Sequence, residues 1–72
     1  MSVARVTEIS VTNTESIEAA INEGVNRATS TLRGVEGAWV KDMNVLIENG
    51  SIVGYKVNLA ITFLLEDSQQ GS

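Results

Sequence analysis

The side chains that most often carry catalysis or bind transition metals are missing from this sequence. It contains neither cysteine nor histidine. A nucleophile activated by histidine, a disulfide bond and a zinc site built from cysteine or histidine are therefore excluded. Acid–base chemistry would fall to carboxylates, lysine or tyrosine, and no pair of these residues stands out as a catalytic arrangement. The sequence predicts a protein that is not an enzyme.

Carboxylates are the remaining donors for a metal ion. Oxygen ligands for calcium or magnesium could come from Asp42, Glu48, Glu66 and Asp67. No loop has the Asp-x-Asn-x-Asp-Gly spacing of a dedicated calcium site. We expect solvated carboxylates and no metal site.

Three side chains are suited to contact a small molecule, namely Trp39, Tyr55 and Lys56. The indole of Trp39 can stack on a planar ring or fill a subunit interface, where aromatic residues are favoured. Lys56 can be a solvated surface lysine, or it can contact a carbonyl or phosphate and favour an anionic ligand. Tyr55 has the same two readings, sheet or interface packing and ligand contact.

Charge and hydropathy limit the partners. The chain has 5 basic and 9 acidic residues and a net charge of −4. The basic residues are scattered, whereas nucleic-acid binding needs them clustered. No apolar run approaches the roughly 20 residues of a membrane span, and the start lacks a secretory signal. We expect a cytoplasmic protein without nucleic-acid or membrane partners.

A helix between β-strands must position these side chains. β-branched residues predict a first strand over residues 3–11. Apolar residues then recur every three or four positions, which predicts an amphipathic helix over residues 14–33. This stripe consists of Ile17, Ile21, Val25, Ala28 and Leu32. Gly24 costs about 1 kcal/mol in a helix interior, so close packing against a sheet would explain it.

Both ends of the helix have recognisable signals. Thr12 and Glu15 have the spacing of a capping box, and Asn13 or Thr14 could also cap the first turn. Gly34 can adopt the left-handed conformation that ends a helix.

A hairpin follows the helix. Strands are predicted over residues 38–48 and 51–66, and Asn49-Gly50 between them predicts a two-residue type I′ turn. One whole face of the last strand is apolar and should lie against the helix. That face consists of Val53, Tyr55, Val57, Leu59, Ile61, Phe63 and Leu65. The fold is therefore α+β, a single β-α-β-β domain over residues 1–67 with a polar tail over 68–72.

The small size of the domain predicts assembly. The chain has 72 residues, and a domain of that size buries only about 60% of its unfolded surface. Without disulfides or a metal, further copies of the chain are the remaining source of stability. The last strand, longer than the usual 3–10 residues, must also project beyond its own helix.

The hairpin turn also predicts the strand register. Counted outward from Asn49-Gly50, Met43 faces Lys56 and Trp39 faces Ala60. Four large apolar side chains then lie away from the helix, namely Trp39, Met43, Val45 and Ile47. Because the same register turns Asp42 and Asn44 toward the helix, a β-bulge or a hairpin that extends past the helix is the alternative.

The order and spacing of these segments resemble the dodecin family of small flavin-binding proteins, over nearly the whole chain. The segments that carry the resemblance are Arg5 to Ile9, Thr12 to Glu15, Glu18 to Ile21 with Gly24, Arg27-Ala28, Thr31 to Arg33, Tyr55 to Val57 and Phe63 to Asp67. The resemblance implies a three-stranded antiparallel sheet partly wrapped around one helix. It also implies a hollow homododecamer that stores or sequesters flavins at subunit contacts. Some members are linked to coenzyme A or to calcium.

The chain departs from the family at the flavin site. The resemblance implies that a Trp at the start of the second strand sandwiches the flavin and that a Gln on the third strand holds it. These positions correspond to Gly37 and Lys56 here. Gly37 has no ring, and Lys56 lacks the acceptor of an amide. Trp39 lies two residues later on the same face, about 6.5–7 Å along the strand.

Two functions remain open. The first is a homo-oligomeric binding or storage protein for riboflavin, FMN or a related planar ligand, with Gly37, Trp39, Tyr55 and Lys56 as the candidate site residues. The second is a dodecin-like assembly that binds no flavin and has a structural or ion-binding role.

Overall fold

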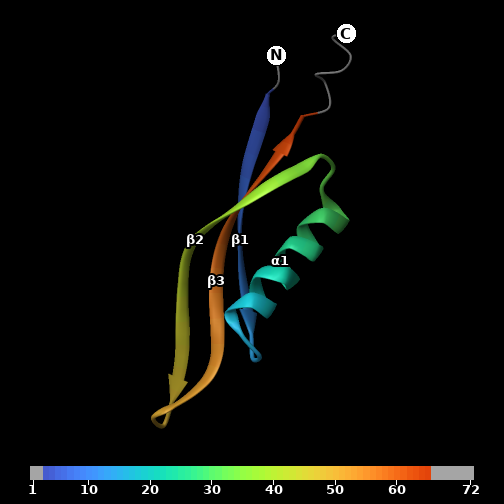
Figure 1. Ribbon diagram of the computed structural model, residues 1–72. Coiled ribbons are helices and arrows are strands. Elements are labelled where there is room, and N and C mark those ends of the chain that lie inside the picture. Colours follow the sequence, from blue (N-terminus) through green and yellow to red (C-terminus); the bar gives the residue numbers. More distant parts are fainter. Residues whose placement is uncertain (1–2, 66–72) are drawn as a thin grey trace.

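The computed structural model describes residues 3–65, which form one helix and three strands (Figure 1). In chain order these are β1 (Ala4–Asn13), α1 (Ile17–Thr31), β2 (Val35–Glu48) and β3 (Ser51–Leu64). Both strand pairings are antiparallel, and β3 lies between β1 and β2. The predicted α+β fold is confirmed. The end of the predicted last strand and the tail over 68–72 lie outside the described residues.

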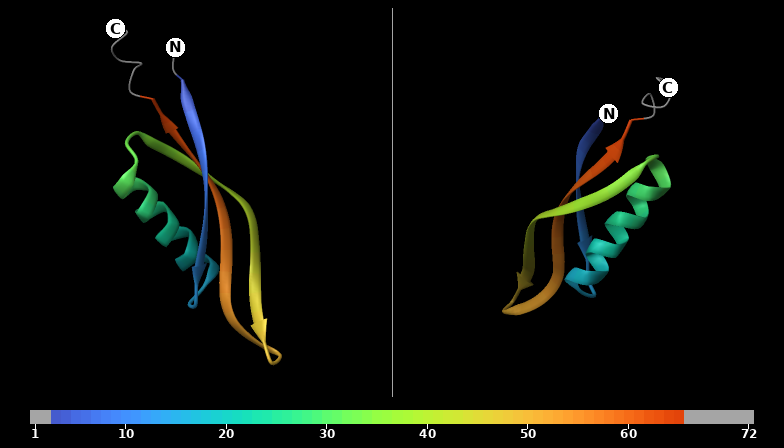
Figure 2. Two further views of the ribbon diagram at one scale, coloured as in Figure 1. Left: turned by 180° about the vertical axis from the view of Figure 1, so that it is seen from behind. Right: turned by 45° about the horizontal axis from the view of Figure 1, so that its top comes forward.

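The molecule is elongated, and the helix covers only part of the sheet. Its extents are 57 × 18 × 13 Å. Figures 1 and 2 show α1 along one face of the twisted sheet, while the hairpin of β2 and β3 extends past the first turn of the helix. The hairpin end therefore lacks a covering layer within the described chain.

The core lies between α1 and the central strand. Its fully buried large side chains are Val57, Leu59 and Ile61 of β3, which confirms the middle of the predicted apolar face, whereas Val53 at its start is 44% exposed. On the helix side, the buried residues are all small, namely Ala20, Gly24 and Ala28. The larger members of the predicted stripe flank them and are partly buried. Small residues at the contact let the helix lie close to the sheet.

Helix and sheet approach each other closely at Gly24. A Cβ atom there would lie 2.7 Å from Cδ1 of Leu59 and 2.9 Å from Cγ2 of Val11. Both distances are shorter than carbon atoms tolerate, since their optimal separation is about 3.5–4.0 Å. Close packing therefore explains the glycine, as predicted.

The predicted capping of the helix start was wrong. Ser16 is the N-cap, and its hydroxyl accepts a hydrogen bond from the backbone N–H of Ala19 at 2.9 Å. Thr12 and Asn13 cannot cap, because β1 continues through them in pairing with β3. Asn13 instead accepts hydrogen bonds from the backbone N–H groups of Glu15, at 2.6 Å, and Ser16, at 3.4 Å. This turn connects the strand to the cap.

The helix, predicted over residues 14–33, is shorter at both ends, although Gly34 follows its end in the left-handed conformation as predicted. Leu32 is the C-cap, and its N–H donates to the carbonyl of Ala28 at 2.8 Å. Gly34 has φ +70°, and its carbonyl accepts from the N–H of Leu64 at 2.9 Å. The left-handed residue thus turns the chain directly into β2, which begins at Val35, three residues earlier than predicted.

The hairpin turn is as predicted, but the register of its strands is not. Asn49 and Gly50 have φ +51° and +77°, as a type I′ turn requires. Val53 is then an extra residue in β3, since Leu46 pairs with Gly54 and Ile47 with Ile52. Met43 consequently pairs with Val57 and not with Lys56.

A second bulge reverses the shift. Lys41 is an extra residue in β2, because Val40 pairs with Leu59 while Asp42 pairs with Asn58. One bulge lies in each strand, so the two offsets cancel, and Trp39 pairs with Ala60 as predicted. A bulge at Glu36 follows, between the pairs of Val35 and Gly37.

The bulges change which side chains share a face. Met43 and Val45 lie opposite Val57 and Tyr55, on the helix side of the sheet, and Ile47 follows them by strand alternation. Their predicted position away from the helix was wrong. They are nevertheless 57%, 42% and 63% exposed, because α1 packs mainly on β1 and β3 and leaves the edge strand β2 largely uncovered. Both alternatives raised by the sequence, a bulge and an overlong hairpin, are present.

Candidate functional site

The sheet face away from α1, here called the open face, carries the candidate ligand-binding side chains. No described segment lies over it (Figure 2). The strand register places on it Glu8 and Ser10 of β1, Gly37, Trp39 and Asp42 of β2, and Lys56, Asn58 and Ala60 of β3. The open face is therefore a shallow, polar surface around one indole ring.

Trp39 belongs to a row of three paired residues, one from each strand, that crosses the sheet. It pairs with Ala60 of β3, and Ala60 in turn pairs with Glu8 of β1. Ala60 is 5% exposed, whereas Trp39 is 66% exposed. The small side chain in the middle leaves room above the sheet between the ring and the carboxylate.

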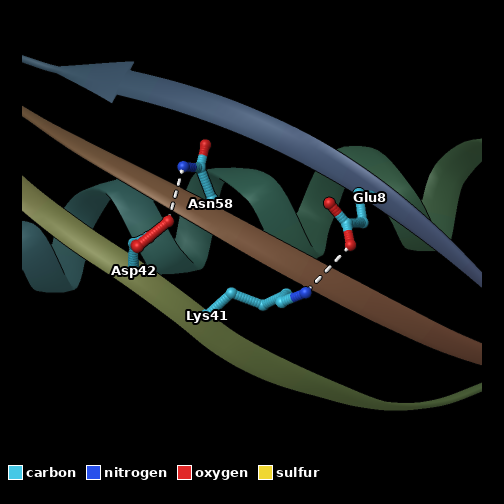
Figure 3. A network of polar contacts seen from close by, with 4 residues as sticks. All are labelled: Glu8, Lys41, Asp42 and Asn58. Carbon is cyan, nitrogen blue, oxygen red and sulfur yellow. Dashed lines mark hydrogen bonds and ion pairs between the residues drawn. The ribbon is translucent and has the colours of Figure 1, made fainter.

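Lys41 fills part of that room. Its ammonium Nζ lies 3.1 Å from Oε2 of Glu8 and 5.7 Å from the centroid of the Trp39 ring. Figure 3 shows its side chain running from β2 across β3 toward β1. The lysine thus joins the ring on one edge strand to a carboxylate on the other.

A second polar pair lies beside the first. The side-chain amide of Asn58 donates to Oδ2 of Asp42 at 3.2 Å (Figure 3). The bulge at Lys41 makes this possible, since it turns Asp42 away from the helix. Both pairs border a depression of about 240 Å³ lined by Glu8, Ile9, Ser10, Lys41, Asp42 and Asn58.

Gly37 lies on the same face as Trp39, two positions earlier. It pairs with Thr62, and a Cβ atom there would meet nothing within 4 Å. On its helix side, a depression of about 260 Å³ opens between α1 and β2 and is lined by Val25, Thr29, Val35, Glu36, Gly37, Ala38 and Ile61. The space for a larger side chain at Gly37 is open.

Lys56 and Tyr55 lie further along β3. Lys56 is on the open face between Thr12 and Asn44, four residues from Ala60 and so about 13 Å along the strand from the Trp39 row. Tyr55 pairs with Asn13 and Val45 and points to the opposite side of the sheet. A single chain therefore places Gly37, Trp39 and Lys56 on one face without bringing them together, and it separates Tyr55 from them.

Lys41 and Glu8 were missed as site residues by the sequence analysis. A signal for Lys41 exists, because a residue two positions after Trp39 shares its face in a regular strand. Glu8 could be placed only by knowing that β1 pairs with β3, so that Glu8 and Trp39 lie on either side of Ala60.

The described part of the chain holds no group of three or more acidic residues close enough to share a metal ion. Among residues 3–65, no helix is sufficiently long and apolar to cross a membrane.

Comparison with known proteins identifies the family. A sequence model of the family described as Dodecin matches residues 3–66. This chain belongs to the dodecin family. No curated protein with a similar sequence was found.

Solved dodecin structures resemble the chain closely. Dodecin from Streptomyces davaonensis is 31% identical with a TM-score of 0.83, over 90% of this chain and 96% of that one. A variant of T. thermophilus dodecin is 33% identical with a TM-score of 0.84, over 92% and 98%. A Mycobacterium tuberculosis protein, described as a calcium-chelating antigen and calcium dodecin, is 30% identical with a TM-score of 0.77, over 94% and 97%.

The open face differs from what the dodecin resemblance implies at two positions. The resemblance assigns the ring and the amide of the dodecin flavin site to Gly37 and Lys56, and this dodecin has neither group there. It has instead an exposed indole two positions away, with a lysine over its ring.

Proposed function

We propose that this dodecin assembles with further copies of itself and binds a flavin, riboflavin or FMN, where subunits meet. The observation that carries the proposal is the indole of Trp39, which is 66% exposed on the open face. A large ring kept in solvent on a sheet is typical of a surface that stacks on a planar molecule or a partner. The role is one of binding and storage, without catalysis.

The shape of the open face supports a shared site. Its depression of about 240 Å³ is smaller than the roughly 300–1,000 Å³ of sites that enclose a small ligand. A ligand stacked on Trp39 would therefore leave its second face uncovered on one chain. A neighbouring copy would complete the site, and Lys56, about 13 Å away on this chain, would contact a ligand held by a neighbour's Trp39.

Exposed apolar side chains support assembly independently of the ligand. The large ones among the described residues are Val3, Val6, Trp39, Met43, Val45, Ile47, Ile52, Val53 and Leu64. Five of them form the hairpin cluster of Met43, Val45, Ile47, Ile52 and Val53, on the part of β2 and β3 that α1 leaves largely uncovered. Burying such a cluster is favourable at about 25 cal/mol per Å². The subunit number expected from the family is twelve, and the cytoplasm is the expected location.

A titration of riboflavin and FMN with ligand-free protein, followed by flavin fluorescence, tests the proposal. We expect saturable quenching at micromolar protein, with FMN bound more tightly than riboflavin because of Lys56. Lys56→Gln should remove the preference for FMN, while Glu15→Gln, which changes an exposed charge before the helix, should leave it intact. The absence of quenching at micromolar protein would contradict flavin binding.

The alternative is a dodecin-fold assembly without flavin, with a structural or ion-binding role. Gly37 and Lys56 favour it, since the ring and amide that the resemblance assigns to these positions are missing. A yellow protein with a bound-flavin absorption spectrum after purification would exclude this alternative. Calcium titration monitored by calorimetry tests the ion-binding form, for which the calcium dodecin of M. tuberculosis provides a positive control.

A further inference from the structure

One face of the Trp39 ring is already occupied within the chain. The ammonium of Lys41 lies 5.7 Å from the ring centroid, inside the roughly 6 Å over which a cation is attracted to an aromatic face. The same nitrogen lies 3.1 Å from Glu8. The lysine makes both contacts in one conformation, so the carboxylate holds the cation against the ring.

The strand register and a bulge bring these three side chains together on one face of the sheet. The bulge at Lys41 lies between Trp39 and the Asp42–Asn58 pair. Ala60, directly between Trp39 and Glu8 in the register, has no side chain long enough to block the lysine as it crosses β3 (Figure 3). The three groups come from β1 and β2, the two edge strands, and meet only because β3 lies between them.

An exposed indole without such contacts changes its rotamer within picoseconds to nanoseconds. A binding surface that must stack on a planar molecule benefits when its ring is held beforehand, since less conformational freedom is lost on binding. Among the described residues, Lys41 over Trp39 is the one charged side chain that lies over an aromatic ring.

We propose that Lys41, held by Glu8, is a positioning residue for Trp39, fixing the ring and covering one of its two faces. A planar ligand then stacks on the other face alone. The claim about the ligand rests on the proposed function, whereas the claim about the ring does not. The arrangement differs from an indole open to ligands on both sides.

Trp39 is the single tryptophan of the chain, so fluorescence of the ligand-free assembly, excited at the long-wavelength edge of tryptophan absorption where Tyr55 does not absorb, reports on this ring alone. We expect Lys41→Gln and Glu8→Gln to increase the fast component of the anisotropy decay. Acrylamide quenching should rise in Lys41→Gln as the second face becomes accessible, by at most about 1.5-fold because Trp39 is already 66% exposed. Lys41→Arg, which keeps the cation and the pairing, should restore wild-type values.

Matched charge changes elsewhere provide the controls. Arg33→Gln and Glu15→Gln remove one charge of each sign at exposed positions and should leave both signals unchanged. Circular dichroism and native mass establish that each variant is folded and assembled.

Salt tests the same contact without any substitution. The Lys41 and Glu8 side chains are 40% and 62% exposed, and in 1 M NaCl the screening length falls to about 3 Å. Wild-type protein in 1 M NaCl should therefore approach Lys41→Gln, which should itself respond little. Unchanged anisotropy and quenching in both Lys41→Gln and Glu8→Gln would overturn the positioning role, and so would a failure of Lys41→Arg to restore them.

Riboflavin, which is neutral, separates positioning from simple charge attraction. We expect Lys41→Gln and Glu8→Gln both to weaken riboflavin binding severalfold, although one removes a positive and the other a negative charge. Equal affinities in wild type and variants would overturn the ligand part of the proposal. If wild type binds neither riboflavin nor FMN, the proposed flavin function fails, while the fluorescence of the ligand-free protein still decides whether Lys41 holds the ring.

Discussion

Replacing Gly24 with alanine tests how closely the helix must approach the sheet. The added methyl group would lie 2.7 Å from Cδ1 of Leu59 and 2.9 Å from Cγ2 of Val11. Leu59 is fully buried, so its side chain has no free space into which it can move. The helix would have to shift outward by several tenths of an ångström or more.

Two effects of this substitution oppose each other. Alanine in place of glycine stabilises a helix interior by about 1 kcal/mol. Overpacking a well-packed core costs about 1–3 kcal/mol. We expect the second effect to prevail, with a net loss of about 1 kcal/mol, which lowers the Tm of a domain of this size by about 4–8 °C.

Thermal and urea unfolding followed by circular dichroism at 222 nm measure the change. Protein concentration must be held constant, because assembly couples stability to concentration. Asn22→Ala, at an exposed position of the same helix, reports helix propensity alone and should be neutral or slightly stabilising. A Tm for Gly24→Ala at or above that of wild type would refute the argument from close packing.

Three further substitutions test the helix cap, the open face and the missing ring. Ser16→Ala should cost about 1 kcal/mol in urea unfolding, because the Ala19 N–H loses its capping oxygen; Thr14→Ala, exposed and before the cap, should cost much less. Trp39→Ala should weaken both assembly and flavin quenching, because the exposed indole lies where subunits and ligand are proposed to meet, and an unchanged elution volume in size-exclusion chromatography together with unchanged quenching would argue against this. Gly37→Trp should keep the fold, since a Cβ atom there meets nothing within 4 Å, and should strengthen flavin quenching; a loss of solubly folded protein would contradict the open space.

Local rules of chain conformation were sufficient for much of the fold. Asn49-Gly50 and Gly34 have the positive φ values that their residue types favour, so the turn and the helix end were predictable from a few neighbouring residues. The alternation of β3 likewise predicted the face on which Val57, Leu59 and Ile61 are buried, but not the exposure of Val53 or the burial of Ala60. These features depend on local sterics and on burial of one face.

The errors concern features that depend on pairing between strands. The N-cap is Ser16 and not an earlier residue, because β1 continues to Asn13, which pairs with Tyr55. The bulges at Val53 and Lys41 arise where two long strands must stay paired while the sheet bends. Their residues have no local signature, so counting from the turn placed Met43 on the wrong face.

The sequence by itself determined the β-α-β-β order, the dodecin resemblance and the exclusion of cysteine and histidine chemistry, because these follow from residue types and short-range periodicity. Only the tertiary structure decided what surrounds Trp39. Glu8 and Lys41 are separated by 33 positions in the chain and meet because β3 pairs with both of their strands. Sheet order and compensating bulges, which are collective outcomes of packing, therefore set the environment of the candidate ligand-binding ring.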